Sequence, residues 1–523
     1  MQHQLTIKLS PSEAASEYAI KDHIGKHLSI QNSSITGLTY IKRSIDARGK
    51  EPAILLSVNV FIDEPFYTAA RSNIRLACVS ADAKTVIIAG AGPAGLFAAL
   101  KLLEEGIKPI ILERGKDVRA RRRDLAVLNK EGLINENSNY CFGEGGAGTY
   151  SDGKLYTRSK KRGDISRILN ILVQFGAEEN ILYDAHPHIG TNKLPNIITS
   201  IRKQIIDCGG EVFFEKKITD LVVLQNKLTA VVTSAGDRFD TSHLILATGH
   251  SARDIFQLLH TKNILIEAKP FALGVRVEHP QSLIDQIQYH CPSRGEFLPP
   301  ASYSLVHQAN THGVFSFCMC PGGIIAPAST SPGELVVNGW SPSKRNNPFA
   351  NSGIVVSVNE KDFMPKYHHH GALAAMAFQS DIETKAFTAG GGKFVAPAQR
   401  LVDFCNNTPS ANVPSSSYLP GLNAAPLIDV LPSFIYSSLI TAFKDFGRKM
   451  KGYYTNDAVI VATESRTSSP VRIPRDPNSL EHPQVQGLFP CGEGAGYAGG
   501  IVSAAMDGER VAKQITQMVN GKS

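Results

Sequence analysis

Three glycines, Gly90, Gly92 and Gly95, are spaced as GxGxxG, and the acidic residue Glu113 follows them. In this arrangement the first glycine permits a tight turn, the second lets the backbone approach a pyrophosphate, and the third lets a helix pack closely on a strand. The carboxylate comes about 20 residues later, where an acidic side chain can accept hydrogen bonds from a ribose hydroxyl. These residue types and spacings predict a dinucleotide-binding site.

A strand and a helix must hold these glycines. The apolar, β-branched run 85–89 predicts a buried parallel strand, residues 96–105 have helical periodicity, and a second strand is expected to end at Glu113. A glycine-rich turn alone is a weak signal, but strand, turn, helix and acid agree here. We therefore predict ligand binding around the glycines, Pro93 and Ala94 rather than a bare structural turn.

A basic run, VRARRRD, follows the second strand. Most such runs are solvated loops. A chain that leaves this strand also passes near the pyrophosphate, so that Arg119, Arg121 or Arg122 can pair with phosphate through two parallel hydrogen bonds. Both interpretations stay open, and we take Arg122 and the neighbouring Arg114 as candidate cofactor contacts.

A second glycine-rich segment, CFGEGGAGTYSDGK at 141–154, has too many glycines for a regular helix or strand. Such a backbone usually comes close to something flat or charged. We predict a loop packed on the cofactor ring, with the amides around Gly145 and Gly146 and the side chains of Ser151 and Lys154 as hydrogen-bond donors. The alternative is an ordinary surface loop.

The segment GLFPCGEGAGYAGGIVSAAMDGERVAK at 487–513 predicts a strand, a turn that contains Gly492 and Glu493, and a small-residue helix. That helix is expected to begin near Gly499 and Gly500, with Ile501 in its first turn. A helix amino end favours negative charge, such as a reduced flavin ring develops. We predict that Glu493 and this helix start lie beside the cofactor.

Cys318 and Cys320 form a C-x-C pair in a predicted strand. Residues two apart on a strand share a face, so both thiols could point at one neighbour and act in catalysis. A C-x-C disulfide is strained, however, and cysteine is commonly a small buried hydrophobic residue. Packing is the favoured alternative to a redox role.

The histidines predict no metal site. His186 and His188 flank a proline and have no cysteine or carboxylate partners at metal-ligand spacing. The run 368–370 contains three consecutive histidines, which do not share one helix face. We expect structural or solvent-exposed roles for all of them.

The order of patterns along the chain predicts an α/β protein with several domains. A Rossmann-like FAD-binding domain is expected to carry an inserted antiparallel β-rich substrate domain and a small α+β amino-terminal domain that begins with a βαββ unit. The predicted segments are 1–82 for the small domain, 83–268 and 456–523 for the two parts of the FAD-binding domain, and 269–455 for the insertion.

Composition sets further expectations for the 523 residues, of which 42% are hydrophobic and 19% charged, as in ordinary soluble proteins. No apolar run is long enough to span a bilayer, and the first ten residues do not resemble a signal peptide, so a cytoplasmic location is expected. Eight cysteines without regular spacing indicate reduced thiols. A net charge of +7 is modest for this length, and nucleic acid is not an expected partner.

Several motifs together carry a family resemblance. GAGPAG with Glu113 and Arg114, LATGH at 246–250, and GLFPCGEGAGYAGGI resemble, in this order, the motifs of the glutathione-reductase-related FAD superfamily. At the last motif Glu493 stands where aspartate is commoner in that family. AHPHIGTNKL, FCMCPGG and ESRTSSPVRIPRD narrow the resemblance to bacterial FAD-dependent dehydrogenases, also called NAD(FAD)-utilizing dehydrogenases, which have an additional amino-terminal domain.

The resemblance implies bound FAD and an oxidoreductase, a dehydrogenase or reductase, with its small-molecule substrate or electron acceptor between the flavin and the inserted sheet. Because a second unit of strand, GxGxxG turn and helix is absent from the sequence pattern, NAD(P)H is expected only as a transient donor. The alternatives are a flavin-dependent tRNA-modifying protein and a non-enzymatic FAD-binding module. The expected cofactor-binding residues are Gly90, Gly92, Pro93, Ala94, Gly95, Glu113, Arg114, Arg122, Gly145, Gly146, Ser151, Lys154, Ile218, Thr248, Gly249, Gly492, Glu493, Gly499, Gly500 and Ile501.

Overall fold

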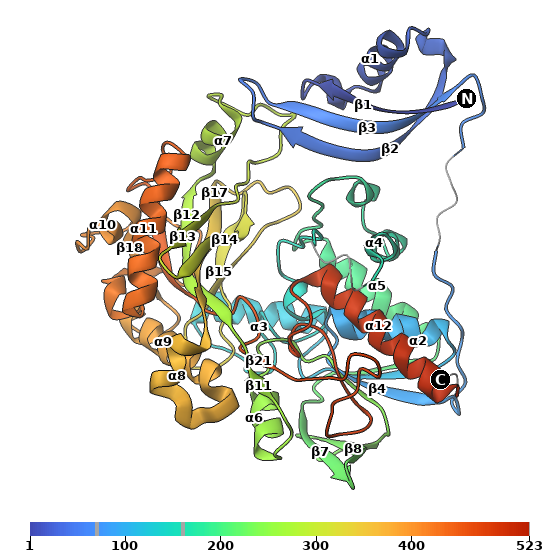
Figure 1. Cartoon of the computed structure of the whole chain (residues 1–523), viewed down its shortest axis with the longest axis vertical. Helices are drawn as coiled ribbons and strands as arrows, with labels where there is room; N and C mark the ends of the chain where they lie inside the picture. Colours follow the sequence, from blue (N-terminus) through green and yellow to red (C-terminus); the bar gives the residue numbers. More distant parts are fainter. Residues whose placement is uncertain (68–72, 158–162, 522–523) are drawn as a thin grey trace.

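The computed structural model describes residues 1–67, 73–157 and 163–521. Figure 1 shows a small amino-terminal sheet at the top, an antiparallel sheet with its helices on the left, and a parallel sheet with its helices at the lower right. The predicted mixed α/β fold, with a Rossmann-like parallel sheet and an antiparallel-rich sheet, is confirmed. The division into four domains stays a prediction.

The amino-terminal unit is a three-stranded antiparallel sheet of order β1-β3-β2 with one helix on it. Its elements are β1 (Gln2–Leu9), η1 (Glu13–Ala15), α1 (Glu17–Leu28), η2 (Asn32–Ser34), β2 (Ile35–Asp46) and β3 (Ala53–Ile62). The helix does not begin at Pro11 as its periodicity suggests. Ser10 bonds Glu13 in a separate turn, and the side chain of Ser16 caps α1 by accepting from the Ala19 N–H group.

The Rossmann-like part has a five-stranded parallel sheet of order β22-β10-β4-β5-β6. Its elements are β4 (Thr85–Ala89), α2 (Pro93–Glu104), β5 (Lys108–Leu112), α3 (Val118–Glu131), η3 (Gly146–Gly148), α4 (Ile165–Gln174), η4 (Glu179–Leu182), α5 (Leu194–Asp207), β6 (Glu211–Phe213), β7 (Ile218–Leu224), β8 (Lys227–Thr233), β9 (Arg238–Asp240), β10 (Leu244–Leu246), α6 (Arg253–Thr261), β22 (Leu488–Pro490) and α12 (Ile501–Val519). The last helix lies along α2 (Figure 1), and Gly508 permits this approach because a Cβ there would lie 2.1 Å from the Ala94 carbonyl oxygen. The glycine loops therefore rest on a rigid base.

The basic run after β5 forms the helix α3, which corrects the interpretation as a loop. The Asp117 side chain caps this helix by accepting from the N–H groups of Arg119 and Ala120. Its buried positions, 118, 121, 125 and 128, lie at helical spacing, and one of them is an arginine. The basic run is therefore an amphipathic helix, although it is rich in charged residues.

The inserted part is built on a seven-stranded sheet of order β13-β14-β17-β12-β20-β18-β19, antiparallel except for its last pair. Its elements and the short strands around it are β11 (Glu267–Ala268), β12 (Phe271–Pro280), α7 (Gln281–Tyr289), β13 (Val306–Ala309), β14 (His312–Cys320), β15 (Ile324–Pro327), β16 (Val337–Trp340), β17 (Phe349–Val358), α8 (Glu360–Tyr367), η5 (His368–Leu373), α9 (Ala374–Gly390), β18 (Ala396–Arg400), α10 (Leu401–Cys405), β19 (Leu422–Ala424), η6 (Leu427–Asp429), α11 (Ser433–Lys449), β20 (Val459–Glu464) and β21 (Val471–Arg472). Helices α9 and α11 pack on this sheet. Its strand β14 reaches the Rossmann-like part, where the site lies.

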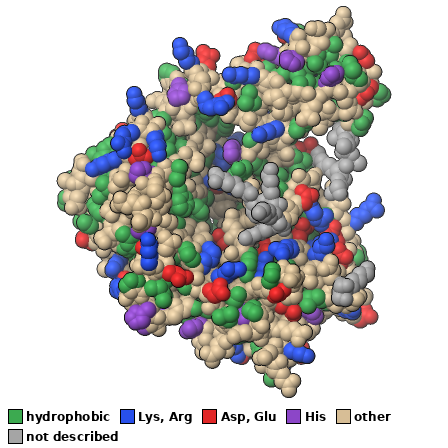
Figure 2. Space-filling view, viewed as in Figure 1, with side chains coloured by type: hydrophobic (Ala, Val, Ile, Leu, Met, Phe, Trp, Pro, Cys, Tyr) green, Lys and Arg blue, Asp and Glu red, His purple; other side chains and the backbone are tan. Residues whose placement is uncertain are grey.

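The amino-terminal unit contacts the rest of the protein through strand β2. Arg43 pairs with Asp184 through its side chain, at 2.7 Å, and its main chain bonds Tyr183 and Ala185 in a parallel bridge. Figure 2 shows that this unit projects from the body and leaves a hollow beneath it. On the face shown, basic and acidic side chains are interspersed.

Candidate functional site

One cavity, of about 400 Å³, brings most of the predicted site residues together. It opens at the carboxyl ends of strands β4, β5, β10 and β22, the usual ligand position in an open parallel sheet, and strand β14 of the inserted sheet forms its opposite wall. The predicted residues in its lining are Gly90, Gly92, Pro93, Ala94, Glu113, Arg114, Gly146, Ser151, Lys154, Ile218, Thr248, Gly249, Cys318, Gly492, Glu493, Gly499, Gly500 and Ile501.

Four predicted residues lie outside this lining. Gly95 packs helix against strand, as its position in the motif predicts, since a Cβ there would lie 2.0 Å from the Gly90 carbonyl oxygen. Gly145 is buried in the second loop with a φ of 78°. Arg122 is exposed, and Cys320 is buried behind the cavity wall. The structure thus does not bring Arg122 or Cys320 to the cavity.

Two helix amino ends point to the cavity, those of α2 and α12, and each has a glycine cap without a side-chain hydrogen bond. A Cβ at Gly92 would meet no protein atom closer than 3.9 Å, and one at Gly499 or Gly500 would meet none within 4 Å. These positions therefore leave space for a ligand next to helix ends that favour anions. The arrangement fits a dinucleotide pyrophosphate at α2.

Glu113 has a role that its sequence position does not predict. Its buried carboxylate accepts hydrogen bonds from the N–H groups of Ala91 at 2.8 Å, Gly115 at 2.8 Å and Gly143 at 3.0 Å. The side chain thereby joins the first glycine loop to the second. A ribose contact at this carboxylate stays a prediction.

Arg121 holds the second glycine loop from its other side. Its fully buried guanidinium donates to the carbonyl oxygens of Asn139, Tyr140, Gly143 and Glu144. All these bonds go to backbone, so that this arginine of the basic run supports the loop and does not face a phosphate. Arg114, in contrast, lines the cavity and lies 4.0 Å from the ring centroid of Phe142.

Cys318 lies on an irregular stretch of strand β14. The pairing of β14 with β17 shifts between Phe317 and Cys320, and Cys318 has a φ of 46°. This bulge breaks the strand alternation, and both thiols still lie within the electrostatic reach of Lys154 and Arg276. Cys318 faces the cavity, whereas Cys320 is fully buried near Arg276.

Positive charge surrounds the Cys318 thiol. Lys154 Nζ lies 3.9 Å from its sulfur and bonds the Met319 carbonyl, and Arg276 donates to the Cys318 carbonyl oxygen at 2.9 Å. The hydrogen bond from Cys320, together with the charges of Lys154 and Arg276, holds the pKa of Cys318 well below the ordinary thiol value. These contacts favour the thiolate form of Cys318, which is the nucleophilic form of a thiol.

A buried ion network closes the inserted part onto the Rossmann-like part. Arg253 on α6 and Arg466 after β20 both pair with Glu383 of α9, at 2.9 and 2.8 Å. Arg466 also lines the cavity. The two guanidinium groups lower the pKa of Glu383 to about 2 although burial alone would raise it.

Some lining residues were not among the predicted site residues. They are Cys141, Phe142, Tyr156, His250, Phe317, Asn338 and Arg466. Five of them lie inside segments that the sequence singles out: the glycine-rich loop 141–154, LATGH, FCMCPGG and ESRTSSPVRIPRD. Tyr156 and Asn338 carry no such signal, because their positions depend on long-range packing.

Metal ligation finds no support. Within residues 1–67, 73–157 and 163–521, no group of three or more histidine, cysteine or acidic residues is arranged to hold a metal ion. His188 instead bonds the Ser343 carbonyl, at 3.2 Å. In the same ranges no helix has the length and apolar character needed to cross a bilayer.

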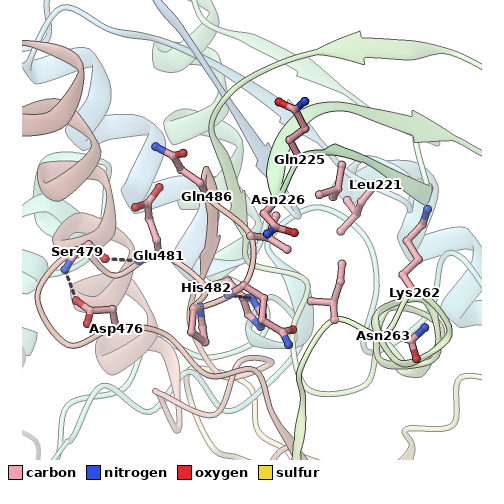
Figure 3. A pocket seen from close by; sticks show the side chains of 15 residues that line it. Leu221, Gln225, Asn226, Lys262, Asn263, Asp476, Ser479, Glu481, His482 and Gln486 are labelled. Atoms are coloured by element: carbon pink, nitrogen blue, oxygen red, sulfur yellow. Dashed lines mark hydrogen bonds between the residues drawn. The ribbon is translucent and has the colours of Figure 1, made fainter.

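A larger groove of about 1090 Å³ lies between the β7–β8 hairpin, the end of α6 and residues 476–486 (Figure 3). None of the predicted site residues lines it. Its polar side chains are engaged locally: Asp476 accepts from the Ser479 N–H group, and Lys262 pairs with Asp220. We assign no function to this groove.

Comparison with known protein families agrees with this geometry. Residues 83–127 match the model of an FAD binding domain, residues 270–467 match the C-terminal domain-like model of FAD-dependent proteins, and residues 1–61 match a domain of unknown function. An uncharacterized protein from Clostridium beijerinckii is 40% identical over 95% of this chain and 96% of its own length. The chain belongs to the family of this protein. FAD is the cofactor that the matched models indicate.

Solved structures give weaker similarity. The tetracycline destructase Tet(51) is 11% identical with a TM-score of 0.35, over 84% of this chain and 83% of its own. Glycine oxidase from Bacillus cereus is 13% identical with a TM-score of 0.30, over 84% and 96%. CtdE in complex with FAD is 10% identical with a TM-score of 0.31, over 84% and 88%. These values are too low to support a functional argument.

We predict that Glu383→Gln destabilises the protein by about 3 kcal/mol, because the two buried arginines, Arg253 and Arg466, then share one remaining carboxylate, that of Glu334. The pKa of Glu383 is 4.5 in the unfolded chain and about 2 in the folded protein. Its contribution to stability is therefore fully present above pH 4.5 and is lost as the pH falls through about 2. Urea unfolding at pH 7 and at acid pH measures both effects. Glu296→Gln, at an exposed position, should change neither, and a native-like Glu383→Gln protein would contradict the assignment.

A second prediction concerns Cys318. Because its thiolate persists below the ordinary thiol range, its alkylation by iodoacetamide should change little between about pH 6 and 8, whereas that of N-acetylcysteine rises about tenfold per pH unit below its pKa. Mass spectrometry of the peptide that contains Cys318 gives the rate. Lys154→Met should restore a pH-dependent rate, and a rate at Cys318 that already follows the reference thiol would refute the thiolate.

Proposed function

We propose that the protein is an FAD-dependent oxidoreductase that binds a small-molecule substrate or electron acceptor between the flavin and strand β14. One observation carries the proposal: a single cavity is lined on one side by the glycine ends of the parallel sheet and on the other by the inserted sheet with Cys318. A dinucleotide domain supplies the cofactor, and the insertion covers its reactive end.

The lining residues divide by position into two groups. Gly90, Gly92 and the α2 amino end would hold the pyrophosphate, and Gly499, Gly500 and the α12 amino end would lie beside the flavin ring. Bound FAD supplies two-electron redox chemistry to this site. The protein binds and orients the two reactants.

The residues from the second loop and the insertion would act on the substrate side. Cys318 offers a nucleophilic thiolate, and Lys154 holds its negative charge. Asp152 lies 3.6 Å from Lys154 and pairs with Arg345, so that the charges of this wall are balanced. We assign catalysis to Cys318, and to Cys320 only the hydrogen bond that stabilises the Cys318 thiolate.

The finer assignment is a dehydrogenase or reductase that receives electrons from NAD(P)H by transient docking, in a cytoplasmic setting. It rests on the sequence resemblance and on a sequence pattern that predicts no second unit of strand, GxGxxG turn and helix. Our proposed segments are the small domain 1–82, the FAD-binding parts 83–268 and 456–523, and the substrate-covering insertion 269–455.

We predict that Gly92→Val folds but does not retain FAD. The new side chain meets no protein atom near its Cβ, and it fills the space that the pyrophosphate needs. Flavin absorbance per protein, measured after gel filtration with added FAD, should fall by at least about tenfold while the thermal transition of the apoprotein stays unchanged. Gly49→Ala, at an exposed turn, is the control. A yellow Gly92→Val protein with normal flavin content would overturn the site.

Anaerobic titration of the FAD-loaded protein with NADH and then NADPH tests the electron donor. We expect one of them to bleach the oxidised flavin band at stoichiometric amounts. Dithionite is the control for a reducible flavin. A flavin that dithionite bleaches and both nicotinamides leave oxidised would reject NAD(P)H as donor and leave the FAD site standing.

A further inference from the structure

A small side pocket of about 50 Å³ lies where the second glycine loop meets strand β16 and the end of β20. It is continuous with the main cavity in its lining, because six residues belong to both: Cys141, Ala147, Ser151, His250, Asn338 and Arg466. The pocket is therefore an extension of the main cavity on its proposed substrate side. It is not a separate pocket elsewhere on the surface.

Two polar atoms in this pocket are buried without a well-formed hydrogen bond. The Oε1 atom of Glu464, whose side chain is 2% exposed, has no partner among the described residues. The Nε1 atom of Trp340 interacts with the Tyr140 side chain, but not in the geometry of a good hydrogen bond. A buried polar atom without a hydrogen bond costs about 1–3 kcal/mol. One acceptor and one donor in the same pocket indicate a polar occupant.

The structure makes room for this carboxylate. Glu464 Oε2 accepts from Arg276 Nε at 2.7 Å, and both side chains are buried. Two glycines permit the pair: a Cβ at Gly339 would lie 1.8 Å from an Arg276 nitrogen, and one at Gly353 would lie 2.6 Å from Glu464 Oε2. A buried ion pair is weak evidence for stability, so the accommodation of this pair, with one oxygen unpartnered, favours a functional role.

We propose that the side pocket binds a hydroxyl group of the substrate, with Trp340 donating to its oxygen and Glu464 Oε1 accepting its proton. A hydroxyl is the smallest group that both donates and accepts. The pocket volume of about 50 Å³ compares with the roughly 30 Å³ that a water occupies in the liquid. The inference rests on the proposed oxidoreductase function and narrows its substrate to an alcohol.

In the oxidative direction the O–H bond breaks and its proton passes to Glu464. As the carbon–oxygen bond becomes a carbonyl, the hydride would leave the same carbon with its electron pair, and bound FAD of the proposed function would supply the two-electron acceptor for it. Both hydrogens of the alcohol are then accounted for, one as the proton on Glu464 and one as the hydride. Glu464 then returns its proton to solvent.

The charges around Glu464 suit a base that works near neutral pH. Burial raises its pKa to about 7, against the opposing effect of Arg276 and Lys154, while Cys318 raises it further. The other titratable groups of the pocket lining are Tyr140, Cys141, Tyr150, His250 and Arg466. Of these, His250 serves as the control position, because it lines both the side pocket and the main cavity.

Trp340 provides a direct measurement, since it is the single tryptophan of the chain. We expect its emission in the FAD-loaded protein, and in the apoprotein, to show a one-proton transition near pH 7 that reports Glu464. Glu464→Gln should abolish the transition. His250→Gln should keep it, and so should Glu509→Gln, a matched change at a half-buried carboxylate that pairs with an arginine, 2.9 Å away.

The hydroxyl specificity is tested on the wild-type protein with two small probes at pH 8. 2-Propanol both donates and accepts a hydrogen bond, whereas acetonitrile only accepts. We expect a saturable change of Trp340 emission with 2-propanol that weakens at least about tenfold in Glu464→Gln, and no saturable change with acetonitrile. Equal, linear responses to both probes would show solvent effects alone and would overturn the subsite.

The experiments distinguish a wrong assignment of Glu464 from an unfolded variant and from a failure of the proposed function. A pH transition that persists in Glu464→Gln but is lost in His250→Gln removes Glu464 as the proton acceptor. If Glu464→Gln does not fold, as judged by circular dichroism, Glu464→Asp replaces it, and its transition should shift from that of the wild type. Loss of FAD binding in the wild type would instead remove the proposed function and leave the emission results on the apoprotein interpretable.

Discussion

The carboxylate of Glu113 is the interaction on which the cavity depends. Three backbone N–H groups, of Ala91, Gly115 and Gly143, converge on it from two loops that are distant in sequence. Because a buried carboxylate is costly without such donors, the loops are held at a fixed separation. Arg121 holds the second glycine loop in a similar way, by donating hydrogen bonds to its carbonyl oxygens. One buried carboxylate and one buried guanidinium thus fix the two glycine loops that line the cavity.

The opposite wall is held by different means. Arg253 and Arg466 converge on Glu383 and close the inserted sheet onto the parallel one, while Arg276 fixes the bulge that turns Cys318 toward the cavity. A few buried charges thus hold the two walls of the cavity together. Segments separated by hundreds of residues thereby form a single chemical environment.

Local rules explain what the sequence could predict. The turn at Gly90, the open space at Gly92 and the helix that begins at Ile501 depend on nearby residues, and they lie where their patterns place them. Helix α3 was missed because a buried arginine occupies a position of its apolar stripe. The bulge at Cys318 and the unpartnered oxygen of Glu464 depend on contacts between distant strands, which no local pattern records.

The bond between Arg43 and the segment around Asp184 gives the small amino-terminal sheet a structural connection to the site. A few residues further on, Pro187 accepts from the Leu155 N–H group, and the N–H group of Ile189 donates to the Gly153 carbonyl. These bonds flank Lys154, whose ammonium lies beside Cys318. One continuous stretch of backbone thus leads from the edge of the small sheet to the thiolate. A truncation before the Rossmann-like part would therefore remove the bonds that Arg43 makes to this stretch and leave it held only from the side of the site.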